Sequence, residues 1–135
     1  MATITKEMLT NGIKDLAPLE KFGKDLASKV QVQDSRNPQR NITKKEAMST
    51  SQIRRFFGAI KRIQADFENL KSEIILLEPK LAYAVGRDQG NSKIDEFYKE
   101  ISPLIREINE DEKKFKNFVS IIEAIVAYHK VQGGK

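Results

Sequence analysis

The chain contains no cysteine, no tryptophan and only one histidine in its 135 residues. The absence of cysteine excludes disulfides and thiolate metal sites, which fits a reducing compartment. No stretch approaches the roughly 18 apolar residues that a membrane span requires. The opening residues, M-A-T-I-T-K-E-M-L-T, contain no apolar segment long enough for a signal peptide. We therefore expect a cytoplasmic protein that does not associate with a membrane.

Residues that usually support catalysis are also scarce. A lone histidine, His129, cannot form a histidine cluster for zinc. There is no glycine-rich phosphate loop after a strand and no serine in a nucleophile elbow. Adjacent carboxylates such as Asp95 and Glu96 would point in different directions on a helix, so a solvated surface explains them. We predict that the protein is not an enzyme and uses neither a metal nor a cofactor.

Positive charge is concentrated in one part of the chain. The formal net charge is +5, yet residues 29–62 alone carry nine cations and two acids, a net +7. Residues 88–135 carry eight cations and nine acids, a net −1. A local basic region of this kind indicates a polyanionic partner such as a nucleic acid, or more plainly a solvated polar loop beside a surface helix.

Apolar residues recur at helical spacing along most of the chain, and no strand alternation is evident. The exception is 31–48, which is polar, contains Pro38 and lacks periodicity. Helices are predicted over 16–30, 49–70 and 72–87, then from about Ser92 and from about Asn109; Ser49 and Gln52 have the spacing of a capping box. We predict an all-α fold, a small bundle of about five helices in a single domain. Its parts would be an N-terminal helix with a basic flexible linker (1–48) and the main helical bundle (49–135).

The second predicted helix carries two rows of cations beside its apolar stripe. Arg54 and Lys61 lie seven residues apart on one row, and Arg55 and Arg62 lie seven apart on the next. Seven residues of helix rise about 10.5 Å, so each pair lies along one side of the helix. These four residues are candidate phosphate contacts.

The segment 79–87, P-K-L-A-Y-A-V-G-R, is uncharged between two cations. A helix that is apolar on every face is normally buried, so we expect Tyr83 and its alanine neighbours to belong to the core. Lys80 and Arg87 stand at the two ends of the segment on the same helical row. Together with the cations of the second predicted helix and with residues 128–130, they are candidates for part of one phosphate-holding surface.

Three blocks follow one another along the chain: T-S-Q-I-R-R-F-F at 50–57, P-K-L-A-Y-A-V-G-R at 79–87, and F-V-S-I-I-E-A-I-V-A-Y-H-K at 118–130, closed by G-G-K. Together they resemble the small subunit of type III-A CRISPR effector complexes, the Csm interference complex. The resemblance covers about 49–135. It implies a helical protein without catalytic activity of its own, several copies of which lie along the guide strand and help to hold target RNA.

The resemblance also implies partners and contact residues. The partners would be CRISPR RNA, target RNA, and the backbone, large polymerase-like and neighbouring small subunits. Matching the blocks residue by residue implies RNA-binding roles for Arg54, Lys80, Arg87, His129 and Lys130. For Arg87 and Lys130, stabilisation of a helix C-terminus is an alternative role. For His129 the alternative is a packed histidine on an apolar face.

Two other functions fit the sequence. One is a pure assembly subunit whose apolar surface joins neighbouring proteins, and which could form a homodimer when isolated. The other is a nucleic-acid-binding protein unrelated to CRISPR, in which the basic segment 29–62 acts as an arm. The cation rows favour RNA binding, because lysine and arginine can hold phosphates without reading bases.

Overall fold

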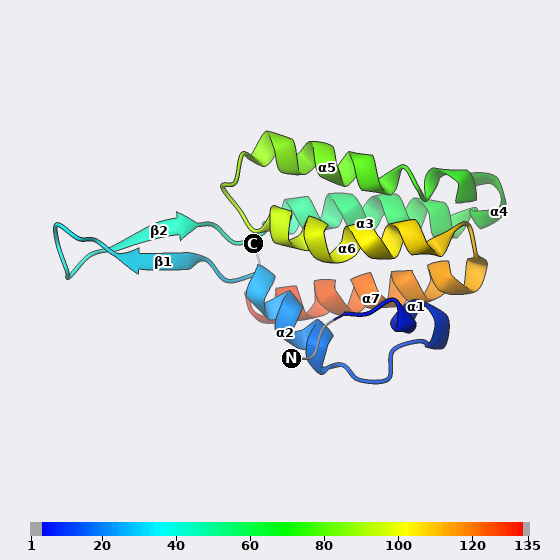
Figure 1. The fold of residues 1–135 in the computed structure, drawn as a ribbon, viewed down its shortest axis with the longest axis horizontal. Helices are drawn as coiled ribbons and strands as arrows, with labels where there is room; N and C mark the ends of the chain where they lie inside the picture. Colours follow the sequence, from blue (N-terminus) through cyan, green and yellow to red (C-terminus); the bar gives the residue numbers. More distant parts are fainter. Residues whose placement is uncertain (1–3, 134–135) are drawn as a thin grey trace.

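The structure, a computed structural model, describes residues 4–133; Gly134 and Lys135 of the last sequence block lie outside the described residues. Figure 1 shows a bundle of helices with a two-stranded hairpin projecting from one end. The elements in chain order are α1 (Glu7–Asn11), α2 (Ala17–Leu26), β1 (Val30–Gln33), β2 (Asn41–Lys45), α3 (Thr50–Ala65), α4 (Phe67–Leu70), the 3-10 helix η1 (Lys71–Glu73), α5 (Leu77–Asp88), α6 (Ile94–Ile108) and α7 (Glu112–Val131). The prediction of a small single-domain helical bundle is confirmed, and the five longer helices are the five predicted.

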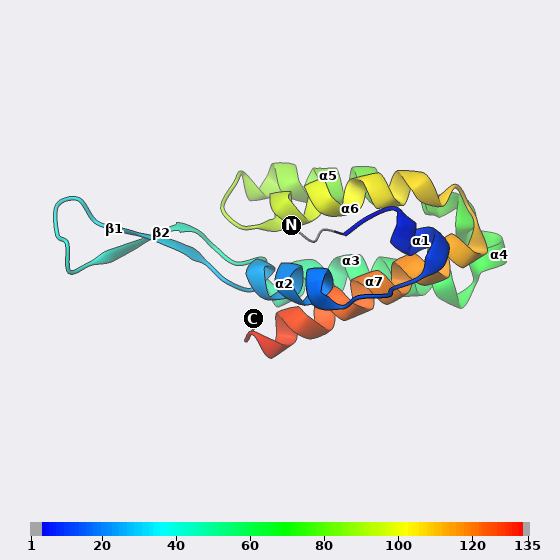
Figure 2. The ribbon, with the colours of Figure 1, turned by 60° about the horizontal axis from the view of Figure 1, so that its bottom comes forward.

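The hairpin corrects the prediction of a flexible linker over 31–48 and of a chain without strands. β1 and β2 are antiparallel, with Val32 opposite Ile42 and Gln33 opposite Asn41. The first helix was predicted over 16–30, but it ends at Leu26, and Val30 is the first residue of β1. The alternation Val-Gln-Val-Gln is a strand pattern, but it is only four residues long and precedes a charged turn with Pro38. In Figures 1 and 2 the hairpin extends away from every helix.

The base of the hairpin is tied to the bundle. The Lys45 ammonium lies 2.7 Å from a carboxylate oxygen of Asp95 and 3.5 Å from one of Glu96, both in the first turn of α6. Glu46 continues the connection: its backbone N–H donates to the Asn91 carbonyl, and its carbonyl accepts from the Lys93 N–H. The hairpin therefore leaves the bundle from a fixed base.

The core is shared by α7 and the helices around it. α7 packs against α1, α2, α3 and α6, and α5 covers the other side of α3 and α6. Figure 2 shows α2 and α1 lying along α7. The N-terminal helices belong to the same core, because Leu9, Leu19 and Leu26 are completely buried with the residues of α7.

The helix ends explain where the predicted boundaries hold and where they move. Ser49 and Gln52 form the predicted capping box: the Gln52 N–H donates to Ser49 Oγ at 3.1 Å, and the Ser49 N–H donates to Gln52 Oε1 at 2.8 Å. The helix predicted to reach residue 70 stops at Ala65 because Asp66 leaves helical geometry at φ −145°. Pro79 occupies the first turn of α5, where its missing N–H breaks no hydrogen bond.

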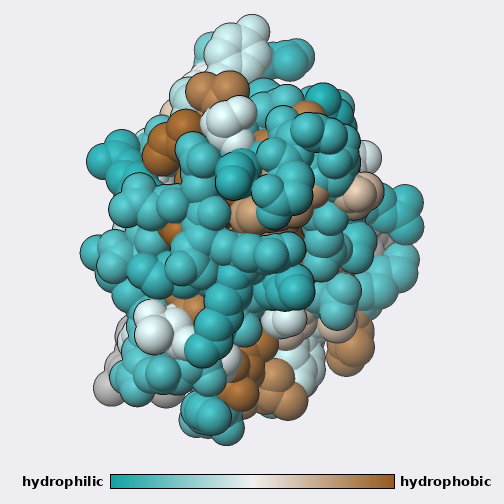
Figure 3. All heavy atoms as spheres, turned by 90° about the vertical axis from the view of Figure 1, so that its right-hand side faces the viewer, coloured by the Kyte–Doolittle hydropathy of each residue, from teal (hydrophilic) through white to brown (hydrophobic). Residues whose placement is uncertain are grey.

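The bundle end opposite the hairpin is mostly hydrophilic, as Figure 3 shows from that side. The turn between α6 and α7 lies there and exposes three consecutive acids, Glu110, Asp111 and Glu112. Asp111 caps α7 by accepting the Lys114 N–H at 2.9 Å.

Glu78 joins α5 to α6. Its Oε1 accepts from the Tyr98 hydroxyl at 2.7 Å, the Ser102 hydroxyl at 3.0 Å and Arg106 Nη2 at 3.1 Å. The hydrogen bond from Tyr98, followed by the one from Ser102, lowers the pKa of Glu78. Because the unfolded chain then takes up the proton first, the contribution of Glu78 to stability is present above its unfolded pKa and is lost as pH falls through the lower folded pKa.

We expect Glu78→Gln to be less stable than the wild type near neutral pH, and we expect this difference to shrink as the pH falls through the lowered pKa of the Glu78 carboxyl. Urea unfolding at several pH values measures both effects. Glu123→Gln is the matched control, because Glu123 is an exposed residue of α7 that forms no ion pair with any described residue. A difference that stays constant down to acid pH would contradict the assignment.

Candidate nucleic-acid interface

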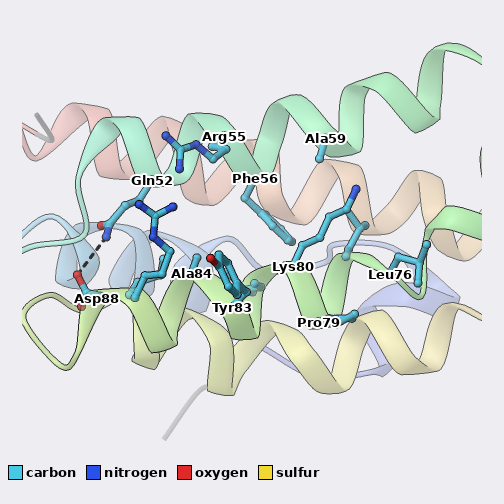
Figure 4. Close-up of a pocket in the computed structure, with 14 residues that line it drawn as sticks. Gln52, Arg55, Phe56, Ala59, Leu76, Pro79, Lys80, Tyr83, Ala84 and Asp88 are labelled. Carbon is cyan, nitrogen blue, oxygen red and sulfur yellow. Dashed lines mark hydrogen bonds between the residues drawn. The ribbon is translucent and has the colours of Figure 1, made fainter.

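A groove runs between α3 and α5 on the outer side of the bundle. Its cavity volume is about 750 Å³, and its lining is largely apolar, with Phe56 and Ala59 from α3 and Leu77, Leu81 and Ala84 from α5. Figure 4 shows the two helices forming opposite walls, with side chains of both reaching into the space between them. The groove therefore combines segments from the first two sequence blocks.

Three of the cations predicted from sequence border this groove. Arg55 comes from α3, and Lys80 and Arg87 come from α5; all three are exposed. None of them forms an ion pair with another residue in the range 4–133. Sequence reasoning placed them on two separate helices, and the structure brings them to one site.

The other cations of α3 lie outside the groove lining. Arg62 Nη1 lies 2.6 Å from Glu73 Oε1, and this hydrogen bond lowers the pKa of the Glu73 carboxyl. The Lys61 ammonium lies 5.8 Å from the centroid of the Phe57 ring. Arg54 is exposed and forms no ion pair within the described part of the chain. Of the four cations in the two predicted rows on α3, only Arg55 lines the groove.

His129 is a structural histidine in this conformation. Its side chain is 1% exposed, and Nε2 lies 2.6 Å from the Met48 carbonyl oxygen. A carbonyl oxygen only accepts, so Nε2 donates and carries the proton. The Met48 N–H donates in turn to the Leu26 carbonyl at 2.8 Å. His129 thus joins the hairpin base to α7 with a buried side chain, while its neighbour Lys130 is exposed but does not line the groove.

Tyr83 was expected in the core and is instead 69% exposed. α5 is an outer helix that buries Leu77 and Leu81 on one face, so its opposite face remains open. The Arg87 guanidinium lies 5.9 Å from the centroid of the Tyr83 ring. Figure 4 shows the ring between α5 and α3, within the groove. The sequence signal for this pair was the spacing of four residues, which places side chains together on a helix.

One carboxylate, Asp88, lies at the end of the groove. Its Oδ1 accepts from Gln52 Nε2 at 3.3 Å, and its Oδ2 accepts from the Ser92 N–H at 2.7 Å. The first hydrogen bond joins the start of α3 to the end of α5, and the second holds the turn between α5 and α6. The balance of charged side chains that line the groove is three cations to one acid.

A metal-binding cluster and a membrane-spanning helix are both absent from residues 4–133. These residues contain no group of three or more histidine, cysteine, aspartate or glutamate side chains that could hold a metal ion. In the same range, no helix has the length and apolar character needed to span a bilayer.

Comparison with protein families shows which family the chain matches. A family model described as Csm2 Type III-A matches residues 20–135, which include α2 to α7, the hairpin and every cation considered above. This confirms the family resemblance drawn from the three sequence blocks. Neither the curated proteins nor the solved structures contain a match.

Proposed function

Because the chain belongs to the Csm2 family and is a small subunit of a type III-A CRISPR Csm complex, we propose that it holds RNA backbone within that complex. The observation that carries the proposal is the convergence of Arg55, Lys80 and Arg87 on one groove. None of the three forms an ion pair within 4.0 Å among the described residues, so a phosphate would not have to displace a directly bound carboxylate.

The proposed contact is electrostatic and indifferent to sequence. In the assembled complex the guide RNA selects its target by base pairing, so a subunit lying beside it needs only to hold phosphates. Each copy supplies a few contacts, and copies that act together along one RNA gain affinity through multivalency. Weak binding by the free protein is therefore compatible with firm holding in the complex.

The remaining exposed cations extend the proposed surface. Arg54 and Lys61 would add contacts beside the groove on α3, and Lys130 would add one at the end of α7. Arg62 contributes less, because an RNA phosphate would have to compete with Glu73 for its guanidinium. We do not include His129, because its ring is buried against Met48.

We further propose that the chain performs no chemistry. Cleavage of RNA and DNA and synthesis of cyclic oligoadenylate would belong to the backbone and large subunits, with CRISPR RNA and target RNA as shared ligands. The proposed place of action is the cytoplasm. The groove fits a holding role because no buried nucleophile or acid–base pair is among its lining residues.

The test is a triple variant, Arg55→Ala, Lys80→Ala and Arg87→Ala. Three exposed ionic contacts of about 0.5 kcal/mol each predict an affinity for single-stranded RNA lowered about tenfold at low salt. The slope of log affinity against log salt should fall by about 2, because each lost contact to a single strand removes about 0.7. Filter binding or fluorescence anisotropy over a salt series, on the free protein and on the assembled complex, measures both quantities.

The matched control is Lys99→Ala, Lys113→Ala and Lys116→Ala, which removes the same charge from exposed positions on α6 and α7. Its salt slope should stay close to that of the wild type. Equal loss in both variants would show that net charge, and not the groove, determines binding. Unchanged affinity in the groove variant would refute the proposal.

A pure assembly role is the second candidate, favoured by exposed apolar side chains. Ile75 and Leu76 precede α5 and are 53% and 47% exposed, and Val32 and Ile42 lie opposite each other on the hairpin. Such surfaces are typical of contacts with neighbouring subunits, and could also pair two isolated copies. This function predicts that Ile75→Ser and Val32→Ser weaken co-purification with the complex while the groove variant retains full RNA affinity.

A further inference from the structure

Tyr83 is an exposed aromatic side chain inside a groove bordered by cations. We infer that this ring is a stacking platform for one unpaired RNA base whose flanking phosphates are held by Arg55, Lys80 and Arg87. The inference rests on the proposed function and goes beyond it, because it names a nucleotide as the occupant of the groove where the proposed function requires only phosphates at its border.

The shape of the groove suits a nucleotide. Its volume of about 750 Å³ falls within the range of about 300–1,000 Å³ that is typical of small-molecule sites. The lining beside Tyr83 is apolar, with Phe56 and Ala59 on the facing helix and Ala84 adjacent on α5. A base entering the groove would exchange water for aromatic and aliphatic contacts on both sides.

Arg87 contacts the Tyr83 ring and also contributes positive charge to the groove. Its guanidinium lies 5.9 Å from the Tyr83 centroid, a distance at which cation and aromatic face attract. The pair therefore restrains the ring from one side and leaves the rest of it open, as its 69% exposure shows. Restraint of a stacking residue before binding reduces the entropy lost when the base arrives.

Charge selects RNA over other aromatic or apolar ligands. The groove brings together three exposed cations, while the oxygens of its single carboxylate, Asp88, already accept hydrogen bonds from Gln52 and Ser92. An apolar helix from a neighbouring protein would fill the groove but would leave the three cations facing it without counterions. A nucleotide supplies both the flat apolar face and the negative charge.

The occupant must be an unpaired base. In a duplex both faces of each base are stacked on neighbours, so a tyrosine ring could reach only the backbone or a terminal pair. Stacking on an aromatic ring is also tolerant of sequence, because every base has a π-face. The site would therefore recognise an extruded or single-stranded nucleotide without restricting the guide sequence.

The experiment compares two single-stranded RNA oligonucleotides of equal length and charge, one with bases and one containing abasic residues. The full-length wild-type protein should bind the RNA with bases about tenfold more tightly, the effect expected for one stacked base. Tyr83→Ala should lose this preference and retain its affinity for abasic RNA. Tyr83→Phe, which keeps the ring, should retain the preference. A 2-aminopurine base placed in the RNA should be quenched by the wild type and by Tyr83→Phe, but not by Tyr83→Ala.

Each other outcome overturns the inference in an identifiable way. If the wild type shows no preference between the two RNAs, or if the preference survives in Tyr83→Ala, no base stacks on this ring. If Tyr83→Ala weakens both RNAs equally, Tyr83 acts only by positioning Arg87. If Tyr83→Ala disrupts co-purification with the complex and leaves the RNA preference intact, a protein occupies the groove. The proposed function fails separately, when the Arg55, Lys80 and Arg87 triple variant binds abasic RNA as tightly as the wild type.

Discussion

Phe97→Ala should lower the free energy of unfolding by about 3–5 kcal/mol. Phe97 is completely buried on α6 between two other helices. Its ring is nearly parallel to that of Phe22 in α2, with centroids 6.4 Å apart, and nearly perpendicular to that of Phe56 in α3, with centroids 5.3 Å apart. The substitution removes both aromatic contacts and leaves a cavity where α2, α3 and α6 meet, which these helices cannot fully close.

The effect is large compared with the total stability of a domain, about 5–15 kcal/mol. For a chain of this size it corresponds to a melting temperature lower by roughly 10–20 °C. Chemical unfolding and calorimetry measure the two quantities. Tyr83→Ala is the control, because it removes an exposed ring of similar size and should change stability by no more than about 0.5 kcal/mol. Similar losses in the two variants would be incompatible with the described core.

Gly23→Ala and Gly58→Ala should change stability in opposite directions. At Gly23 on α2, an added Cβ would lie 2.8 Å from the Ile125 carbonyl oxygen and 2.8 Å from the Cβ of Tyr128, both on α7. Contacts this short force the helices apart, at a cost of about 1–3 kcal/mol. At Gly58 on α3, nothing lies within 4 Å of the added Cβ. There, alanine should gain about 0.5–1 kcal/mol because it reduces the entropy of the unfolded chain and favours the helix.

The pair of variants isolates packing from helix propensity, because each makes the same chemical change within a helix. Urea unfolding of both proteins, with the wild type alongside, measures the difference. A gain in stability at Gly23 would mean that α2 does not approach α7 as closely as the structure describes. A loss at Gly58 would mean that this position on α3 is not open.

Much of the helical architecture could be predicted because it rests on local rules. The stripe that includes Ile53, Phe56, Ile60 and Ile63 became the buried face of α3, and the Ser49 and Gln52 capping box formed as expected. A glycine within a helix, such as Gly23 in α2, lowers helical stability, and sequence alone gives no reason for its presence. Its reason is tertiary: only a residue without a side chain permits the approach of α2 to α7.

The missed features also depend on tertiary structure. Tyr83 looked buried because no charge separates it from its neighbours, but α5 lies at the edge of the bundle and covers only one of its faces. Val30 and Val32 gave too short a strand signal to outweigh the polar residues around them. The groove itself required two helices from separate sequence blocks. The sequence could therefore group Arg55, Lys80 and Arg87 on one basic surface, but it could not place them around a groove.

The hairpin has a mechanical consequence because of how its base is held. Lys45 is fixed to α6 through Asp95, and Met48 is fixed to α2 through the Leu26 carbonyl and to α7 through His129. The base of the hairpin is therefore held rigidly against the bundle, while its outer part projects from it. A force that a neighbouring molecule exerts on the hairpin tip would be transmitted through these contacts to α2, α6 and α7 together, and would tend to rotate the bundle as one body.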